Sequence, residues 1–393
     1  MKQQIRMAVV GGRRGAAFDS VLSSLAEQLQ LVAVCDLNEE VVKEWQKKYP
    51  EIEGFTSYEQ LLDSPRIDAV FLATPMLLHA KQAVQALRAG KHVLSEVIGS
   101  HTLEDSWELI EAVESSGLTY MMAENYCYTR ENMMVQHMAD AGAFGEITYA
   151  ECGYIHDCRN LLHNKDGGLT WRGEYIRDYN GNTYPTHSIG PVAKWLGINS
   201  TGGDAFEELV TVSSKSRSAA QHFKEHFSAE HPAAQAGFWN QGDSSTTLIR
   251  TKKGVLISLR FDVISARPHN MTHYGLQGTE GAYLAPRYGG EDPLIWLANE
   301  KTSEPHPEWQ SLWSLEQKWE HPAWRQWMKQ ASNTGHGGGD FFVIHEFVTS
   351  ILEKRKPAID VYDAVLWSSI FPLSVQSVAL GNQPIKFVDF IKK

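Results

Sequence analysis

The strongest constraint on the fold lies near the amino terminus. A short apolar run at 5–10 leads into the glycine-rich stretch GGRRG at 11–15, and a second apolar run at 31–35 ends at Asp36. A buried strand, a glycine turn, a helix, and a second strand followed by a carboxylate make up the dinucleotide-binding unit of a Rossmann fold. Gly12 and Gly15 would let the backbone approach a pyrophosphate, which the free N–H groups of the helix start would bind.

The carboxylate at position 36 narrows the choice of dinucleotide. A carboxylate at the end of the second strand accepts a hydrogen bond from a ribose 2′-hydroxyl and repels a 2′-phosphate. The residue after it is Leu37, not an arginine. The pattern therefore favours NAD over NADP. Asp36 would also suit a second role, as the cap of the next predicted helix over 39–49.

Strands and helices continue to alternate up to residue 125. This alternation predicts an α/β Rossmann domain over 1–125, with a doubly wound, mainly parallel sheet. Ligands bind beyond the carboxyl ends of the strands in such sheets. Those ends carry Thr74, Glu96, Glu124 and Asn125. The strands are expected at 5–10, 31–35, 67–73, 92–94 and 118–123, and the helices at 39–49, 76–89 and 102–116.

From residue 126 the pattern changes to that of an α+β domain, expected over 126–393. A helix over 130–141 precedes alternating stretches, which predict a large open, mainly antiparallel sheet. We expect one face of this sheet to pack on helices. The other face would bury against a second subunit, giving a homo-oligomer, a dimer or larger. Strands are expected at 147–154, 208–213, 244–251, 255–263 and 275–277, and carboxyl-terminal helices at 340–352 and 361–380 would pack back on the Rossmann domain.

Composition excludes several classes of function. The formal net charge of −11 and the absence of a long basic block argue against nucleic-acid binding. No apolar stretch is long enough to span a membrane, and no secretory signal pattern precedes the first strand. Four cysteines without CxxC spacing indicate a reducing compartment. We therefore expect a cytoplasmic protein.

The run GNTYPTH at 181–187 brings together side chains suited to proton transfer. Tyr184 and His187 supply a phenol and an imidazole within four residues, with a threonine between them. Pro185 fixes its own φ and favours an extended conformation for Tyr184. Such a run displays side chains at the end of a loop. We expect the substrate, a small sugar or glycoside, to meet the nicotinamide cofactor here.

On these motifs the chain resembles the Gfo/Idh/MocA oxidoreductases. It shares their Rossmann domain, a Thr74-Pro75 pair followed by His79, and the glutamate of their EKP motif at Glu96. The motif's lysine, which transfers protons in the sugar dehydrogenases of that family, is replaced by Val97. One branch shares this replacement, and the chain looks like that branch, the NAD-dependent N-acetylgalactosaminidases of glycoside hydrolase family 109. Matching segments span almost the whole chain: SEVIGS at 95–100, AENYCYTREN at 123–132, GYIHDCR at 153–159, TWR at 170–172, GNTYPTHSIGPV at 181–192, QGTEGAY at 277–283, HGGGDF at 336–341 and DVYDAVLWSSIFPLS at 360–374.

The resemblance implies a set of site residues. His79 is equally compatible with a structural role, as a helix histidine whose ring is satisfied within the fold. The family has a substrate-binding tyrosine just before the QGT segment, and here His269 or Asn270 stands near its place, with Tyr274 elsewhere. The implied cofactor contacts are Gly12, Arg14, Gly15, Asp36, Thr74, His79, Glu96, Val97, Asn125 and Tyr184, and the implied substrate contacts are Glu124, Tyr154, Arg172, Tyr184, His187 and His269, with His156 close by.

The resemblance also implies a reaction. NAD would oxidise C3 of a sugar, elimination would release the C1 substituent, water would add, and the hydride would return. His187, Tyr184, Tyr154 and His156 are the candidate catalytic residues. The alternative is an ordinary NAD(P)-dependent sugar or polyol dehydrogenase with His187 as its base, against which the missing lysine counts. A non-catalytic NAD-binding sensor is a third hypothesis.

Three other patterns in the sequence resemble sites of other kinds, and each has a simpler explanation. His222, His226 and His231 have a spacing that metal ligands use, but the surrounding residues predict a solvated helix face, so we expect no metal site. His336 precedes three glycines, as in an esterase oxyanion loop, yet no GxSxG motif exists in the chain. Six tryptophans between 286 and 330 occupy a stretch with a helical pattern. Packing is a more common role for such residues than stacking on sugars.

Overall fold

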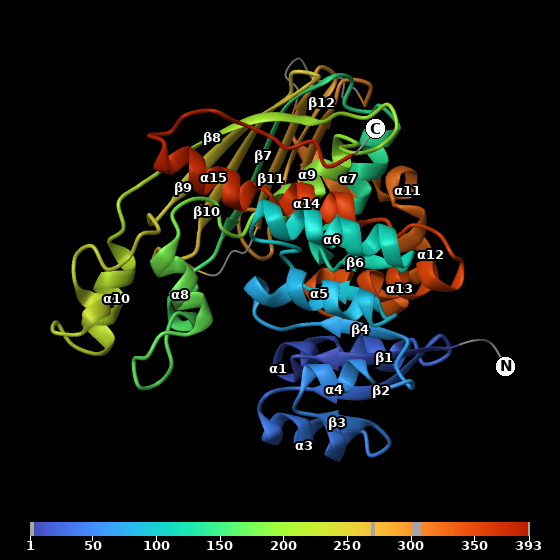
Figure 1. The fold of residues 1–393 in the computed structure, drawn as a ribbon. Coiled ribbons are helices and arrows are strands. Elements are labelled where there is room, and N and C mark those ends of the chain that lie inside the picture. Colours follow the sequence, from blue (N-terminus) through green and yellow to red (C-terminus); the bar gives the residue numbers. More distant parts are fainter. Residues whose placement is uncertain (1–3, 269–271, 301–307, 392–393) are drawn as a thin grey trace. The chain divides into compact units, whose positions relative to one another are not determined.

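A computed structural model describes residues 4–268, 272–300 and 308–391 (Figure 1). The chain divides into two compact units. The first unit contains residues 1–130, 322–369 and 390–393, and the second contains 131–321 and 370–389. No helix among the described residues is both long enough and apolar enough to cross a lipid bilayer.

The first unit is built on a parallel sheet of six strands in the order β3-β2-β1-β4-β5-β6, which confirms the predicted Rossmann architecture. The strand order reverses between β1 and β4, so right-handed crossovers place α1 and α3 on one face and α5 and α6 on the other. α1 accordingly packs on α3, and α5 on α6. The crevice of a doubly wound sheet lies at such a reversal, beyond the carboxyl ends of β1 and β4.

The first unit also contains a carboxyl-terminal group of helices. α13 packs on η3 and α2, and α14 packs on α6 and β6. The elements of the first unit are β1 (Ile5–Val10), α1 (Gly12–Gly15), η1 (Ala16–Phe18), α2 (Asp19–Ser24), β2 (Leu29–Cys35), α3 (Glu39–Lys48), β3 (Glu53–Phe55), α4 (Tyr58–Leu62), β4 (Ala69–Leu72), η2 (Met76–Leu78), α5 (His79–Arg88), β5 (His92–Ser95), α6 (Leu103–Ser116), β6 (Tyr120–Met122), η3 (Asn125–Tyr128), α12 (Pro322–Ala331), η7 (His336–Gly338), α13 (Gly339–Leu352) and α14 (Val361–Ser368).

Two glycines let the first strand and the first helix meet. Gly11 has a φ of +91°, and a Cβ placed on it would lie 2.5 Å from the carbonyl oxygen of Ala73 at the end of β4. A Cβ on Gly15 would lie 2.3 Å from the side chain of Val9. Gly11 therefore makes the turn, and Gly15 allows α1 to pack closely on β1.

The second unit is built on a nine-stranded sheet in the order β14-β13-β12-β11-β7-β10-β9-β8-β15. All neighbouring strands are antiparallel except β7 and β10, so the predicted mainly antiparallel sheet is confirmed. In β9, buried residues alternate with exposed ones along the whole strand, as expected for a sheet with one covered face. α9 packs on β7 and β11, and α15 packs on β8.

Several elements of this unit were not predicted from the sequence. The expected helical pattern over 286–330 is wrong in its first part, because Trp296 lies in β13, which pairs with β12. The elements are α7 (Arg130–Asp140), β7 (Ile147–Ile155), η4 (Arg159–Leu161), α8 (Trp171–Asp178), α9 (Thr186–Trp195), β8 (Phe206–Ser213), α10 (Ser218–His226), η5 (Pro232–Ala234), β9 (Ser245–Thr251), β10 (Leu256–Asp262), β11 (Thr272–Gly278), β12 (Gly281–Leu284), β13 (Leu294–Leu297), β14 (Gln310–Ser311), η6 (Leu312–Leu315), α11 (Glu316–Trp319), α15 (Ile370–Ala379) and β15 (Ile385–Lys386).

The role of Gly11 can be tested against a glycine that shares its conformation but not its surroundings. Gly90 also has a positive φ, of +76°, and no atom lies within 4 Å of a Cβ built there. Gly11→Ala should lower the free energy of unfolding by about 1–3 kcal/mol more than Gly90→Ala does, because it adds a clash to the same backbone strain. Urea unfolding of both variants measures the difference. Equal losses would contradict the close approach.

Candidate active site

Asp36 braces the glycine turn. Its Oδ2 accepts a hydrogen bond from the backbone N–H of Gly12 at 2.9 Å, and its Oδ1 accepts one from Asn38 at 2.9 Å. The alternative role of Asp36 as the cap of α3 is wrong, because the side chain of Asn38 caps that helix by accepting from the N–H of Glu40. The carboxylate is half-exposed at the end of β2, where it suits a ribose hydroxyl.

An ion pair joins the first helix to the end of β5. Arg14 Nε lies 2.5 Å from Glu96 Oε1, and the Glu96 side chain is largely buried. The Arg14 guanidinium also lies over the ring of Phe18, 5.2 Å from its centroid. Val97, in the position of the missing lysine, is buried. The charged partner of the motif's glutamate is therefore Arg14.

His79 connects the loops that follow β4 and β5. Its Nε2 lies 2.8 Å from the carbonyl oxygen of Thr74, and its Nδ1 lies 2.9 Å from that of Ile98. Burial lowers the pKa of His79 below its usual value. The side chain of Thr74 donates to Gln82 at 2.5 Å. The ring of His79 thus holds two loops together, and its contact with the cofactor stays a prediction.

Glu124 and Asn125 follow β6, and both are buried. Glu124 caps η3 by accepting a hydrogen bond from the N–H of Tyr126 at 3.2 Å. The Nδ2 group of Asn125 donates to Asp340 Oδ1 at 2.8 Å. His336 also faces this carboxylate, with its Nδ1 3.0 Å from both oxygens. The glycine-rich segment therefore meets the strand end that carries two predicted site residues.

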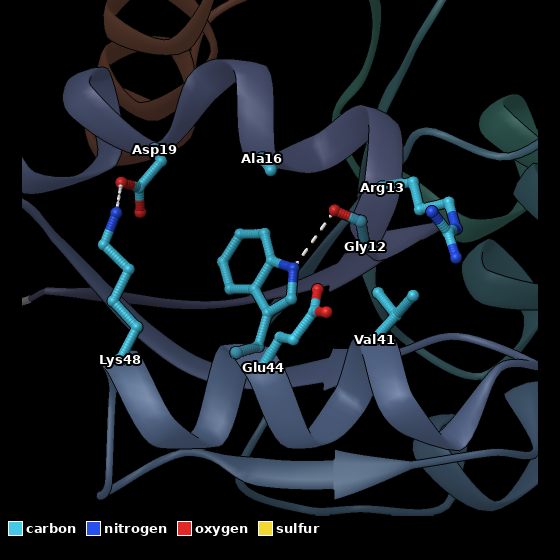
Figure 2. Close-up of a pocket in the computed structure, with 8 residues that line it drawn as sticks. Gly12, Arg13, Ala16, Asp19, Val41, Glu44 and Lys48 are labelled. Atoms are coloured by element: carbon cyan, nitrogen blue, oxygen red, sulfur yellow. Dashed lines mark hydrogen bonds and ion pairs between the residues drawn. The ribbon is translucent and has the colours of Figure 1, made fainter.

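A cavity of about 360 Å³ lies between α1 and α3 (Figure 2). Trp45 also lines it, and its indole N–H donates to the carbonyl oxygen of Gly12 at 3.0 Å. Asp19 and Lys48 form an ion pair at its edge. Among the predicted cofactor-binding residues, Gly12 alone lines this cavity. The cavity therefore lies to one side of the carboxylates and amides that fit a dinucleotide.

The second unit gathers the predicted catalytic residues into one group, here named the tyrosine–histidine cluster: Tyr154, His156, Tyr184 and His187. The ring centroid of Tyr154 lies 5.3 Å from that of Tyr184 and 5.5 Å from that of His187. Tyr184 and His187 are 5.2 Å apart, and His156 is 5.8 Å from Tyr154. The cluster forms because Tyr154 lies near the end of β7, on which α9 packs.

The run 181–187 is anchored by its backbone. The N–H of Asn182 donates to Ser374 Oγ at 2.8 Å, and the side chain of Gln241 donates to the carbonyl oxygen of Gly181 at 3.0 Å. The sequence predicted that this run displays its side chains at the end of a loop. That prediction is wrong for His187, which is the second residue of α9 and is buried. The helix begins directly after Pro185, whose fixed φ suits a helix start.

Proline 191 has a direct consequence for His187. In an α-helix the N–H of residue 191 would donate to the carbonyl oxygen of residue 187, but proline has no N–H. That oxygen instead accepts a hydrogen bond from the hydroxyl of Tyr274 on β11, at 2.5 Å. The sequence analysis assigned no role to Tyr274. The signal that could have found it was a proline four residues after His187, because a buried carbonyl needs a donor.

The other predicted substrate-binding residues are less closely linked to the cluster. Arg172 lies on α8, with its guanidinium 4.3 Å from the ring centroid of Trp171. Burial raises the pKa of the Cys158 thiol to about 12, and the charge of Arg172 opposes that rise. The charge of Arg172 is therefore felt by Cys158, two residues after His156. His269 lies outside the described residues.

The histidines of α10 do not form a solvated face throughout. His222 is only 2% exposed, and its Nε2 lies 3.0 Å from Nε2 of His163. Burial, followed by the charge of His226, lowers the pKa of His222 to about 4. The predicted solvated face is therefore wrong for His222, whereas His226 is exposed. No group of three or more His, Cys, Asp or Glu residues in the described part of the chain could hold a metal ion.

Two family models match the chain. Residues 5–124 match the oxidoreductase family with an NAD-binding Rossmann fold, and residues 128–393 match the carboxyl-terminal domain of glycosyl hydrolase 109. The first unit therefore contains an NAD-binding Rossmann domain.

Similar proteins cover almost the full chain. A glycosyl hydrolase family 109 protein of Solibacter usitatus is 35% identical over 99% of this chain and 88% of its own length. An alpha-N-acetylgalactosaminidase of Shewanella oneidensis is 34% identical over 99% of this chain and 85% of its own length. The fold is similar to that of a levoglucosan dehydrogenase in complex with NADH, with a TM-score of 0.80, 20% identity, and coverage of 99% of this chain and 100% of the other.

Tyr274→Phe tests the link between β11 and His187. The variant removes the hydroxyl that donates to the His187 carbonyl, so we expect a loss of about 1–3 kcal/mol in the free energy of unfolding. Tyr283→Phe is the matched control. Both tyrosines pack on Trp195, but the hydroxyl of Tyr283 has no hydrogen-bond partner within the described residues. Urea unfolding should find the control unchanged or more stable, and a similar loss in both variants would refute the assignment.

Proposed function

The chain belongs to glycosyl hydrolase family 109, and we propose that it is an NAD-dependent glycosidase. The substrate is an N-acetylhexosaminide or a related glycoside. The observation that carries the proposal is the tyrosine–histidine cluster. It supplies proton-transferring side chains to a chain whose EKP-type motif has Val97 in place of lysine.

NAD, when bound, would supply a hydride acceptor for C3 of the sugar and a hydride donor after water has added. The proposed cofactor contacts in the first unit are Gly12, Arg14, Gly15, Asp36, Thr74, His79, Glu96, Val97 and Asn125, with Tyr184 from the second. Asp36 accepts from ribose hydroxyls, because its carboxylate is half-exposed beside the glycine turn. The net reaction is hydrolysis, since the hydride is returned.

The chain's own residues move the protons. His187 or Tyr184 takes the proton of the C3 hydroxyl, and Tyr154, together with His156, takes the proton from C2. A C3 ketone makes that C2 proton acidic, so its loss expels the substituent at C1. Water then adds at C1 and gives its other proton to the oxygen that departed, while the base returns the C2 proton. The proton of the C3 hydroxyl is returned to that oxygen when the ketone is reduced. A phenol is a weak base at neutral pH. The imidazoles therefore matter: His187 contacts both tyrosines, and His156 contacts Tyr154.

The remaining polar residues position the sugar. Arg172 fixes a hydroxyl or the amide of the substrate, because its guanidinium donates in a fixed fork, and Glu124 accepts from a hydroxyl. His269 stands near the place of the family's substrate-binding tyrosine. A relative over the full chain is named alpha-N-acetylgalactosaminidase, which supports an N-acetylated sugar as substrate.

We also propose that the enzyme works in the cytoplasm. All four cysteines are buried and free, as a reducing compartment keeps them. An imported small glycoside is the corresponding substrate.

A glycoside assay tests the proposed reaction. Purified protein, without added NAD, should release nitrophenol from nitrophenyl glycosides with no build-up of NADH, because the hydride is returned in each turnover. A glycoside carrying deuterium at C2 should lose the label to water. His187→Ala should abolish release while NAD stays bound, measured as cofactor recovered from denatured protein. The competing function is an ordinary sugar dehydrogenase, which would give stoichiometric NADH from a free sugar and no nitrophenol.

The uncovered face of the large sheet supports a homo-oligomer. Val212, Leu248 and Leu256 are 55%, 40% and 43% exposed on the neighbouring strands β8, β9 and β10. Exposed apolar side chains grouped on one sheet face indicate an interface. Leu248→Asp should reduce the molar mass measured by light scattering to that of a monomer. Leu380→Asp, at a side chain 54% exposed after α15, should leave the mass unchanged. A native monomer would contradict the proposal.

A further inference from the structure

Within the described residues, the side-chain amide of Asn125 forms a hydrogen bond through its nitrogen but none through its oxygen. Its side chain is fully buried at the start of η3, and its Nδ2 donates to Asp340 Oδ1 at 2.8 Å. The amide oxygen, Oδ1, has no hydrogen-bond partner among residues 4–268, 272–300 and 308–391. Burying an acceptor without a donor is costly. The vacant acceptor therefore points to a ligand that brings a donor.

Asp340 decides which way this amide faces. A carboxylate only accepts hydrogen bonds, so it selects the NH₂ group of Asn125 and turns the oxygen away. Asp340 is 1% exposed in the first turn of α13, and the helix start favours a negative charge there. Nδ1 of His336 lies 3.0 Å from both carboxylate oxygens, which holds the carboxylate in position.

The glycines of this segment make the contact possible. A Cβ on Gly339 would lie 2.2 Å from the backbone oxygen of Asn125, and one on Gly335 would lie 2.3 Å from Asp340 Oδ2. Gly338 has a φ of +93° directly before α13. The HGGGDF segment therefore delivers a buried carboxylate to the end of β6. The glycines of this segment are thus explained by its packing on Asn125, without an esterase-like oxyanion loop.

The position of Asn125 identifies the half of the cofactor that it faces. In a Rossmann sheet of this order, β1–β2–β3 and β4–β5–β6 form two mononucleotide-binding halves. Asp36 follows β2 and belongs to the adenosine half, so Asn125, which follows β6, belongs to the nicotinamide half. In that half a ribose hydroxyl both donates and accepts, and either amide orientation would satisfy it. The nicotinamide carboxamide has a separate N–H edge and C=O edge, so an acceptor held in one orientation selects its N–H edge.

We propose that Asp340, held by His336, orients Asn125 so that its Oδ1 accepts an N–H of the nicotinamide carboxamide. Asn125 is then a specificity-determining contact for the nicotinamide ring, and Asp340 and His336 are positioning residues. The proposal rests on residues of the first unit and on its binding of NAD, so it holds whether the enzyme is a hydrolase or a dehydrogenase.

A cofactor analogue tests the proposal through binding. In 3-acetylpyridine adenine dinucleotide a methyl group replaces the carboxamide NH₂. Calorimetry on protein freed of cofactor should show the wild type binding NAD about 5-fold or more tightly than the analogue, because one hydrogen bond is lost. Asp340→Asn accepts either amide orientation, so the preference should fall towards equal binding. ADP-ribose lacks the nicotinamide and should bind wild type and variant equally.

Two further variants separate positioning from general damage. Trp324→Phe removes the indole that donates to the carbonyl oxygen of Tyr128 at the end of η3, so it should lower stability but keep the preference for NAD. Asn125→Ala should abolish the preference, which keeps the test valid if Asp340→Asn does not fold. A wild type that binds both dinucleotides equally, or an Asn125→Ala variant that still prefers NAD, would overturn the proposal.

Discussion

The hydrogen bond from Tyr274 to the carbonyl oxygen of His187 holds the second unit's site in register. Pro191 removes the helical donor for that oxygen, so α9 depends on a side chain of β11. β11 pairs with β7 so that Tyr274 stands opposite Cys152, two residues before Tyr154. The same strand pair that holds the helix start therefore fixes the tyrosine that the histidine ring meets. A shift of one residue between these strands would turn Tyr154 to the other face of the sheet.

The first unit obtains its geometry from glycines at two places of close approach. At Gly11 the missing side chain lets the β1 turn pass the carbonyl oxygen of Ala73, and at Gly339 it lets α13 reach the backbone of Asn125. Each approach brings a carboxylate to a backbone or amide N–H: Asp36 to Gly12, and Asp340 to Asn125. Hydrogen bonds lower the cost of burying the Asp340 carboxylate, and they hold both it and the half-exposed Asp36 in one orientation. A hydrogen-bonded carboxylate therefore lies beyond the end of β2 and another beside the residue that follows β6.

Much of the fold follows from local pattern, because the Rossmann half alternates short buried strands with helices that end at glycines. Gly117, for example, ends α6 in the left-handed conformation. The later strands β12 and β13 were missed because they are short and follow a run rich in glycine. The cluster of Tyr154, Tyr184 and His187 joins residues from separate segments, and the motifs named its members without giving their contacts. The burial of His222 depends on His163, 59 positions away, which no local pattern encodes.

The number of proton-transferring groups bears on the kind of reaction. Oxidation of a sugar hydroxyl needs one base, which a single lysine or histidine can provide. Elimination requires a second base at C2, and the group that returns this proton must remain in place until water has added. The tyrosine–histidine cluster contains two phenols and two imidazoles: Tyr154, Tyr184 and His187 are in mutual ring contact, and His156 contacts Tyr154. The proposed hydrolysis through a transient ketone needs more than one such group, whereas oxidation alone needs one. The composition of the cluster is therefore compatible with the proposed hydrolysis.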